Sequence, residues 1–427
     1  MWKERLKKHR LALFLLLLLF AVRLAALHEL GARYTLWSDD ASYVNSGIRF
    51  METGMITIHS EWPSAQIMPG MPVLIALVAR LFGTGHALWL ALKLLWISMG
   101  TLAAWFLYRS VSLFTPRWCA ALPMLLLLRP DLVWMDNLVL TETPYMLALS
   151  AGVYCTLKLG KSPSWPAFWG LAAAFMAAFL LRANILVYLP FAIVYLLLSG
   201  YDKRLLLKQS ALLALVLLCF LLPWTARNYA RFHAFIPVTY GAGNPLLLGT
   251  YQGHGYPADE ELDYAANVDA VVRETYRDYY GTDGQVQPRY QQYVSLARDG
   301  IMAKYRQKVW WQQDKAGFLR SYLVSKPAYM VRSVFYWQEV FGIEWEQVIL
   351  AHRLTLLLSA MAAALALLLR RYRAQVLLLL GTYVAHIYMY AAGFAFDRYN
   401  APLQWLLLAL AGLGLHLMAR LVQRQKG

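Results

Sequence analysis

The sequence predicts an all-α protein that crosses a membrane about ten times. Hydrophobic residues make up 59% of the 427 residues, a share that the wetted exterior of a soluble domain does not allow. Apolar runs of about 17 to 25 residues recur along most of the chain, and a helix of that length spans the core of a bilayer. Charged residues reach only 15% and gather between these runs.

The expected spans can be placed in chain order. The first apolar run, Leu11 to Leu27, lacks the small residues of a signal-peptide cleavage site, so we expect a retained first span. The ten expected spans are residues 10–28, 86–108, 117–134, 138–158, 165–181, 183–199, 206–224, 350–369, 374–394 and 400–419. They divide the chain into an N-terminal transmembrane region with seven spans (1–224), a segment of its own (225–349) and a C-terminal transmembrane region with three spans (350–427).

Basic residues set the expected orientation. Lys and Arg cluster in the short loops at Lys3 to Arg10, Arg109 with Arg117, Lys158 with Lys161, Lys203 to Lys208, Arg370 to Arg373 and Arg420 to Lys426. With the residues beside them, these segments hold 18 basic and 2 acidic residues, and the rest of the chain holds 22 of each. Short basic loops stay in the cytoplasm, so both termini are expected there. The net charge of +16 therefore indicates topology, and no nucleic-acid partner is expected.

Two long segments then lie on the outer, extracytoplasmic side. Residues 29–85 contain a polar stretch from Trp37 to Arg49 and an apolar helix that ends at Phe82. That helix is too short to cross alone, and we expect it at the membrane interface. Residues 225–349 are rich in tyrosine and tryptophan, with helical periodicity from Val286 to Val334. This second segment is expected to form a small helical subdomain that rests on the membrane.

Two adjacent carboxylates, Asp39 and Asp40, lie in the first outer segment. Like charges this close, when partly buried, raise the pKa of one carboxyl toward the range of a general base. Such a pair could also provide ligands for a metal ion. The alternative is a helix start, with Ser38 or Asp39 as the N-cap and both acids in the first turn. The two residues alone leave both interpretations open.

Three arginines stand at the outer ends of spans. Arg182 lies between the fifth and sixth spans, Arg227 follows the seventh, and Arg398 with Tyr399 precedes the tenth. A lipid phosphate is a natural partner for them, because a guanidinium offers two parallel donors. Singly, each arginine is better explained by ordinary headgroups or by an ion pair. The acids available for pairing are Asp131, Asp136 and Asp397. Jointly, with the aspartates on the same face, the arginines favour a phosphate site.

Glu142 lies near the outer start of the fourth span. An ionisable group just inside a membrane is costly and faces a polar cavity or a partner. We expect it to orient an arginine or a substrate, and a structural ion pair is an equal alternative. The chain shows no P-loop, no zinc-ligand spacing and no Ser-His-Asp pattern that would indicate another chemistry.

Taken in order, these motifs resemble the bacterial membrane glycosyltransferases of the GT-C superfamily. The branch is the one related to protein O-mannosyltransferases and lipid A aminoarabinose transferases (glycosyltransferase family thirty-nine-like). The motifs that carry the resemblance are Asp39-Asp40 with Tyr43, Pro69-Gly-Met-Pro-Val-Leu, Thr141-Glu142, Arg182, Pro223 to Asn228, Gly241 to Asn244 and Arg398-Tyr399 with Pro402. Together they extend over nearly the whole chain in a fixed order.

The resemblance implies a sugar donor on a polyprenyl-phosphate carrier, used on the extracytoplasmic side of a bacterial cell membrane. It implies transfer with inversion to a hydroxyl of a protein, lipid or cell-surface glycan. Asp39 would be the general base and Asp40 would position it. The implied groups around the donor phosphate are Arg182, Arg227, Arg398 and Tyr399, with Tyr43, Glu142 and Asn228 in support. These groups would stabilise the charge of the leaving lipid phosphate.

One departure from the family concerns a metal ion. The aminoarabinose branch has Glu-Lys before the proline of the first outer segment, whereas this chain has Gln66-Ile-Met-Pro69. A second acidic ligand is therefore missing there, and Glu61 is the candidate substitute. If a divalent cation such as Mg or Mn takes part, Asp39 and Asp40 are its expected ligands.

Other functions remain open on the sequence. A transporter or lipid flippase would need ionisable residues near the middle of the membrane and interrupted helices in paired halves. The nearest such residues are Arg23, Arg80 and Lys93, and each is expected to reach an interface. An oligosaccharide ligase or polymerase could use a similar scaffold with a lipid-linked oligosaccharide as donor. A scaffold protein without chemistry would lack an apolar groove beside Asp39.

Overall fold

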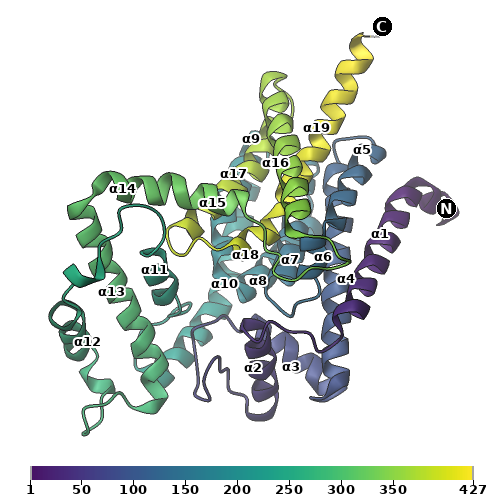
Figure 1. Cartoon of the computed structure of the whole chain (residues 1–427). Helices are drawn as coiled ribbons and strands as arrows, with labels where there is room; N and C mark the ends of the chain where they lie inside the picture. Colours follow the sequence, from purple (N-terminus) through teal and green to yellow (C-terminus); the bar gives the residue numbers. More distant parts are fainter. Residues whose placement is uncertain (1, 426–427) are drawn as a thin grey trace.

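The computed structural model describes the backbone of residues 2–425 and the side chains of residues 9–423. Within that part the chain is helical: two isolated β-bridges, Tyr280–Val286 and Val340–Ile343, are its only extended pairings. Figure 1 shows a bundle of long helices, with the short helices α2 and α3 at its lower end and a lobe of helices beside it. The predicted all-α class is therefore confirmed.

Among the described residues, six helices are long and apolar enough to cross a membrane. They are α1 (Trp2–Leu30), α4 (His86–Val111), α10 (Lys203–Phe232), α16 (Trp345–Leu368), α17 (Arg373–Ala391) and the run of α18 (Asp397–Asn400), η8 (Ala401–Leu403) and α19 (Gln404–Gln425). The bundle also contains α7 (Glu142–Lys161), α8 (Trp165–Leu181) and η2 (Ala183–Val187) followed by α9 (Tyr188–Leu198). These helices correspond to nine of the predicted spans, and the count of ten crossings stays a prediction.

The predicted span 117–134 is wrong as one continuous helix. The chain there forms α5 (Arg117–Ala121), the 3₁₀ helix η1 (Leu122–Leu128) and α6 (Pro130–Met135). Pro130 pushes the preceding residue into an extended conformation, and Arg129 has φ −54° and ψ 134°. The guanidinium of Arg129 then donates to Asp131 at 2.5 Å, so the break is closed by a buried ion pair.

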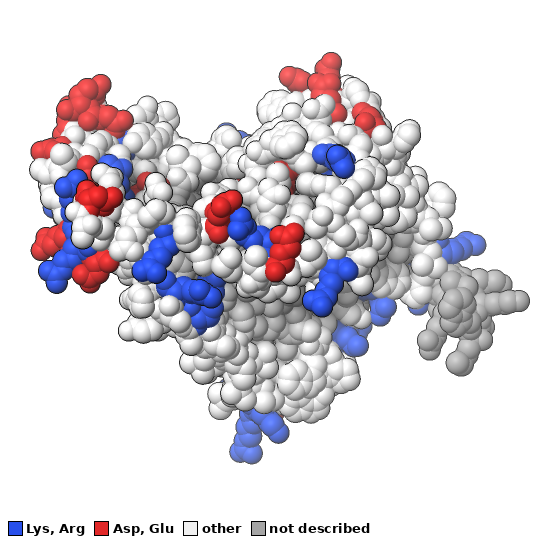
Figure 2. Space-filling model, turned by 90° about the horizontal axis from the view of Figure 1, so that it is seen from below, with Lys and Arg blue, Asp and Glu red and all other residues white. Residues whose placement is uncertain are grey.

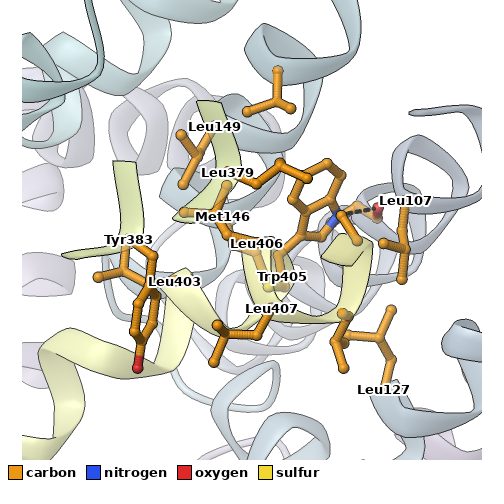
Figure 3. Packing of buried hydrophobic residues seen from close by; sticks show 14 of the residues in the cluster. Leu107, Leu127, Met146, Leu149, Leu379, Tyr383, Leu403, Trp405, Leu406 and Leu407 are labelled. Atoms are coloured by element: carbon orange, nitrogen blue, oxygen red, sulfur yellow. Dashed lines mark hydrogen bonds between the residues drawn. The ribbon is translucent and has the colours of Figure 1, made fainter. Parts of the chain in front are cut away.

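The core of the bundle surrounds Trp405 on α19. Its indole nitrogen donates to the carbonyl oxygen of Ala103 on α4 at 2.9 Å, which satisfies a polar atom that is fully buried. Figure 3 shows the apolar side chains that surround it, which come from α4, α7, α17 and α19 and include Leu107, Met146, Leu149, Leu379 and Leu406. The last helix is thereby held inside the bundle and presents its N-terminal end to α7.

The first outer segment folds as two packed helices, α2 (Asp39–Thr53) and α3 (Gly70–Phe82). They approach closely, since a Cβ added to Gly47 would lie 2.4 Å from the side chain of Ile75. A similar close approach joins α3 to α8, because a Cβ on Gly70 would lie 2.4 Å from the carbonyl oxygen of Leu180. The loop after the first helix is thereby held against the bundle.

The lobe beside the bundle comes from the second outer segment. Its helices are α11 (Gly243–Gly249), α12 (Ala270–Thr275), α13 (Gln291–Gln313), α14 (Lys315–Arg320) and α15 (Lys326–Arg332), with the short turns η3 (Asp259–Glu261), η4 (Ala265–Asp269), η5 (Arg277–Tyr279), η6 (Pro288–Tyr290) and η7 (Ser321–Ser325). The predicted helical stretch is thus present. Seen from below, this lobe carries acidic and basic side chains side by side (Figure 2).

Candidate active site

The centre of the candidate site is the carboxylate of Asp39, in the first turn of α2. The guanidinium of Arg398, on α18 at the start of the last membrane run, donates to its Oδ2 at 2.6 Å. The two residues lie 359 positions apart in the sequence. The Asp39 side chain keeps 38% of its surface exposed, so a substrate hydroxyl can reach it, whereas Arg398 is buried.

A second carboxylate joins two arginines behind Asp39. Glu142, at the start of α7, is fully buried and accepts from the Nε of Arg398 at 2.5 Å. The same Oε1 atom accepts from Arg182, which follows α8. Arg182 also donates through Nε to the hydroxyl of Thr141 at 2.7 Å. Two guanidinium groups therefore share one buried carboxylate, and Asp39 supplies the second negative charge of the cluster.

Aromatic rings position Arg182. Its guanidinium lies 5.4 Å from the ring centre of Tyr399 and 5.9 Å from that of Tyr145, within the range of cation–π attraction. Tyr399 stacks on Tyr390 with ring centres 4.6 Å apart, and the Tyr390 hydroxyl accepts from Arg182 at 3.4 Å. The structure thus places Tyr399 at the predicted site, where its aromatic ring, rather than its hydroxyl, contacts Arg182.

Tyr43 lies one turn after Asp39 on α2 and lines the same region. Burial raises the pKa of its phenol to about 12, and the negative charge of Asp39 adds to the rise. The hydroxyl therefore stays protonated at neutral pH and is available as a donor.

His59 is a residue that the sequence did not indicate. Its Nε2 lies 3.5 Å from Oδ1 of Asp39, and its Nδ1 lies 3.1 Å from the hydroxyl of Ser42. Burial by itself would raise the pKa of the Asp39 carboxyl, but His59 and Arg398 outweigh it and hold that pKa below its usual range. The direction is opposite to the predicted one, because the neighbours that face Asp39 are cationic or hydrogen-bond donors, while Asp40 points elsewhere.

Asp40 is buried beneath the turn that precedes α2. Its two oxygens accept from the backbone N–H groups of Leu36 at 2.7 Å and Ser38 at 3.2 Å. The ammonium of Lys93 lies behind the same turn and donates to the carbonyl oxygen of Tyr34 at 2.7 Å. Asp40 therefore shapes the loop that holds Asp39, and its positioning role in the reaction stays a prediction.

The acidic pair does not fit a divalent cation. Both Asp40 oxygens are engaged by the backbone, and Asp39 faces a guanidinium. Mg and Mn require several oxygen ligands around one point, and the described side chains contain no group of three His, Cys, Asp or Glu residues that could hold a metal. Glu61 does not complete such a set, since it pairs with Arg49 at 3.2 Å and is 86% exposed.

An apolar groove runs beside the cluster. This cavity of about 940 Å³ lies between α3, α4, α7, α8 and α10. Its walls include Val73, Leu77, Leu102, Leu147, Ala173, Ala177 and Phe220. Leu77 and Leu102 are exposed, so the groove opens on the side that faces membrane lipid. A long hydrocarbon chain can lie there with its apolar surface removed from water.

A smaller cavity lies beside both the groove and the cluster. It measures about 190 Å³ and is lined by Tyr43, Thr141 and Arg182 among others. Leu181 lines both cavities, and the start of α3 separates them, with Met68 and Met71 on one side and Pro69 and Gly70 on the other. Arg182 therefore lines a cavity that adjoins the groove at Leu181.

Arg227 does not join the Asp39 cluster. It lies at the end of the groove, where its guanidinium donates to the carbonyl oxygen of Ser64 at 2.9 Å and to Asn228 at 2.8 Å. Asn228 is buried and in turn donates to the carbonyl oxygen of Ile236 at 2.8 Å. Two of the three predicted arginines thus meet at Glu142, and one of them, Arg398, also pairs with Asp39, whereas Arg227 lies at a separate point on the groove.

The remaining acids take other partners. Asp136 pairs with Arg23 at 2.6 Å with both side chains fully buried, which corrects the expectation that Arg23 reaches an interface. Asp131 pairs with Arg129, and Asp397 accepts from the indole of Trp337 at 3.2 Å. None of the three forms an ion pair with Arg182, Arg227 or Arg398 among the described residues.

The lowered pKa of Asp39 predicts a specific acid sensitivity. A carboxyl with a lower pKa in the folded state stabilises the fold above its unfolded pKa, and that stabilisation is lost as the pH falls. The ordinary value is 3.8, so the unfolding temperature of the wild type should fall relative to that of Asp39→Asn between about pH 4 and pH 3. Parallel curves for the two detergent-purified proteins would contradict the assigned direction.

Part of the sequence matches a known family, and the fold is similar to those of solved structures. Residues 65–225 match the family model of dolichyl-phosphate-mannose-protein mannosyltransferases, a stretch that contains most of the groove, Glu142 and Arg182. No sequence match to a curated protein was found. The fold is similar to that of the archaeal oligosaccharyltransferase AglB from Archaeoglobus fulgidus, solved with an inhibitory peptide and a dolichol-phosphate, with 12% identity and a TM-score of 0.54.

The AglB similarity covers 98% of this chain and 52% of that one. ArnT from Cupriavidus metallidurans, solved bound to undecaprenyl phosphate, is also similar, with 16% identity and a TM-score of 0.43 over 95% of this chain and 77% of that one. The family match over residues 65–225 and the fold shared with AglB confirm the predicted resemblance of this chain to the membrane glycosyltransferases of the GT-C superfamily.

Proposed function

We propose that this protein is an integral membrane glycosyltransferase that moves a sugar from a polyprenyl-phosphate carrier to an acceptor hydroxyl. One observation carries the proposal: the accessible carboxylate of Asp39 pairs with Arg398, and Arg398 shares the buried carboxylate of Glu142 with Arg182, beside an apolar groove that is open to lipid. We propose further that the site faces the extracytoplasmic side of a bacterial cell membrane, with both termini in the cytoplasm, because the basic loops all belong to the other side.

The groove supports a lipid-linked donor. Its walls are almost entirely apolar, and its one charged residue, Arg227, lies at one end. A polyprenyl chain in the groove would direct its phosphate past the start of α3 toward Arg182 and Arg398. AglB, which shares the fold, was solved with a dolichol-phosphate, a ligand of the same chemical class.

The cluster supports a single displacement with inversion. The Asp39 carboxylate takes the proton of the acceptor hydroxyl while that oxygen bonds to the anomeric carbon of the sugar. The bond from this carbon to the phosphate oxygen breaks, and its electron pair leaves with the lipid phosphate. Arg182 and Arg398 stabilise the charge that develops on that oxygen. Attack from the face opposite the leaving group inverts the anomeric carbon, and no metal step is needed in this sequence.

A transporter fits the structure less well. The buried pairs Arg23–Asp136 and Arg129–Asp131 are closed ion pairs with further hydrogen bonds, and they lie within the packed core. Neither pair lines the apolar groove or the smaller cavity beside Arg182, which we call the headgroup cavity. They therefore hold helices together. Analysis of the reaction product identifies the acceptor as a protein, a lipid or a glycan. The same analysis distinguishes transfer of one sugar from a ligase or polymerase reaction.

The groove can be tested by filling it. Ala177 on α8 lines the groove and is exposed to it, so Ala177→Trp should block the lipid chain. We expect binding of undecaprenyl phosphate to weaken by about tenfold or more, measured on purified protein in nanodiscs, because several buried methylene groups would lose their site.

The matched control is Leu207→Trp, at an apolar residue of α10 that is 73% exposed and lies outside the groove. This control should bind undecaprenyl phosphate as the wild type does. Equal affinity for all three proteins would show that the groove does not hold the carrier, and the lipid-linked donor would then be excluded.

A further inference from the structure

A second polar cavity lies where the two outer segments meet. It measures about 490 Å³ and is bordered by the loop between α2 and α3, the C-terminal end of α10 and the turn η6 before α13. The polar residues that line it are Arg49, Glu61, Arg231, His233 and Arg289. It shares no lining residue with the groove or with the headgroup cavity.

The charge of this cavity is unbalanced. Three arginines and one histidine line it against one acid, and that acid, Glu61, is already paired with Arg49 at 3.2 Å. Arg231 and Arg289 form no ion pair with any described residue. Like charges gathered in a concave site raise its potential and attract an anion.

Packing holds the cavity in shape. The guanidinium of Arg289 lies 4.5 Å from the ring centre of Tyr290, which is buried in the core that joins the outer segments to α10. Trp62 and Pro63 form part of the wall. A planar guanidinium held against a ring keeps its outer donors free for a planar or tetrahedral oxyanion.

The α10 helix connects this cavity with the donor groove. Phe220, Trp224 and Arg227 line the groove, and Arg231, four residues after Arg227, lines the polar cavity one turn further out. A ligand in the polar cavity would therefore lie next to the end of the groove, outside the position of the lipid chain.

We propose that this cavity is a second anion site that binds a phosphate group, carried by a lipid headgroup or by a soluble phosphorylated compound. Arg231 and Arg289 supply the main donors and Arg49 supports them. That the bound compound is the acceptor rests on the proposed function, whereas the anion site itself does not.

The test uses the full chain in phosphatidylcholine nanodiscs and two probes. Inorganic pyrophosphate is titrated calorimetrically, and retention of phosphatidic acid added to the nanodiscs is followed by native mass spectrometry. The double variant Arg231→Gln/Arg289→Gln should bind the probe at least about tenfold more weakly than the wild type, because two charge-assisted contacts are lost. The matched control, Arg277→Gln/Arg320→Gln, removes two exposed arginines of the same outer segment outside the cavity.

The outcomes separate the sources. Pyrophosphate binding that is lost in the double variant and kept in the control supports a site for soluble phosphate. The same pattern with phosphatidic acid alone supports a headgroup site. Equal binding of both probes by the double variant and the control overturns the proposal. Weaker binding is not due to misfolding if the single variants Arg231→Gln and Arg289→Gln keep the unfolding temperature of the wild type. If the wild type transferred no sugar from a polyprenyl-phosphate donor while this pattern held, the proposed function would fail and the anion site would stand.

Discussion

Asp39→Asn is expected to lower the rate of sugar transfer by about 10²- to 10⁴-fold, the usual contribution of a general base. The amide keeps the shape of the carboxylate but cannot take the proton of the acceptor hydroxyl. Arg398 stays paired with Glu142 in this variant, so the fold and the cation cluster should persist. The measurement is transfer from a polyprenyl-phosphate sugar by purified protein, with donor binding determined in parallel.

Glu52→Gln is the matched control for Asp39→Asn. Glu52 lies on the same helix, is exposed and has no ion pair among the described residues, so its substitution should leave the rate unchanged. Donor binding to Asp39→Asn should stay close to that of the wild type, because Arg182 and Arg398 remain. Transfer by Asp39→Asn at the wild-type rate would remove Asp39 from the mechanism.

Much of the fold was predictable because hydropathy identifies membrane spans. Runs such as 86–108 and 350–369 became α4 and α16 within a few residues, since an apolar helix of this length has one stable environment. The run 117–134 was also long and mostly apolar, but its helix broke at Pro130, and the break was closed by the ion pair of Arg129 with Asp131. A hydropathy average over the whole run does not detect such a break, so Pro130 was the local signal for it.

The site was predictable in part. Asp39, Glu142, Arg182 and Arg398 meet because polar residues at the outer ends of spans must find partners at the same depth of the membrane. The position of Arg227 on the groove depends on how α10 is tilted, which no local pattern records. The loop between α2 and α3 folds back so that the imidazole of His59 lies within hydrogen-bonding distance of Ser42, and no sequence spacing indicates that contact.

Glu142→Gln should destabilise the protein more than any other single change at the site. Glu142 is fully buried and is the shared counter-ion of Arg182 and Arg398, whose side chains are 13% and 7% exposed. Breaking a buried ion pair from one side costs about 3–5 kcal/mol, because a charge is left without compensation. The unfolding temperature in detergent should therefore fall clearly, and transfer should fall with it because both arginines lose their positions.

The ligand dependence of the Glu142→Gln variant separates a binding role from a merely structural one. If Arg182 and Arg398 face the donor phosphate, undecaprenyl phosphate supplies the anion that a neutral glutamine cannot, and it should raise the unfolding temperature of the variant more than that of the wild type. The matched control is Asp136→Asn, which removes the counter-ion of the buried Arg23 and lines neither cavity. That control should also be destabilised, but undecaprenyl phosphate should shift its unfolding temperature no more than that of the wild type. Equal shifts in all three proteins would show that the guanidinium groups hold helices together without meeting the donor.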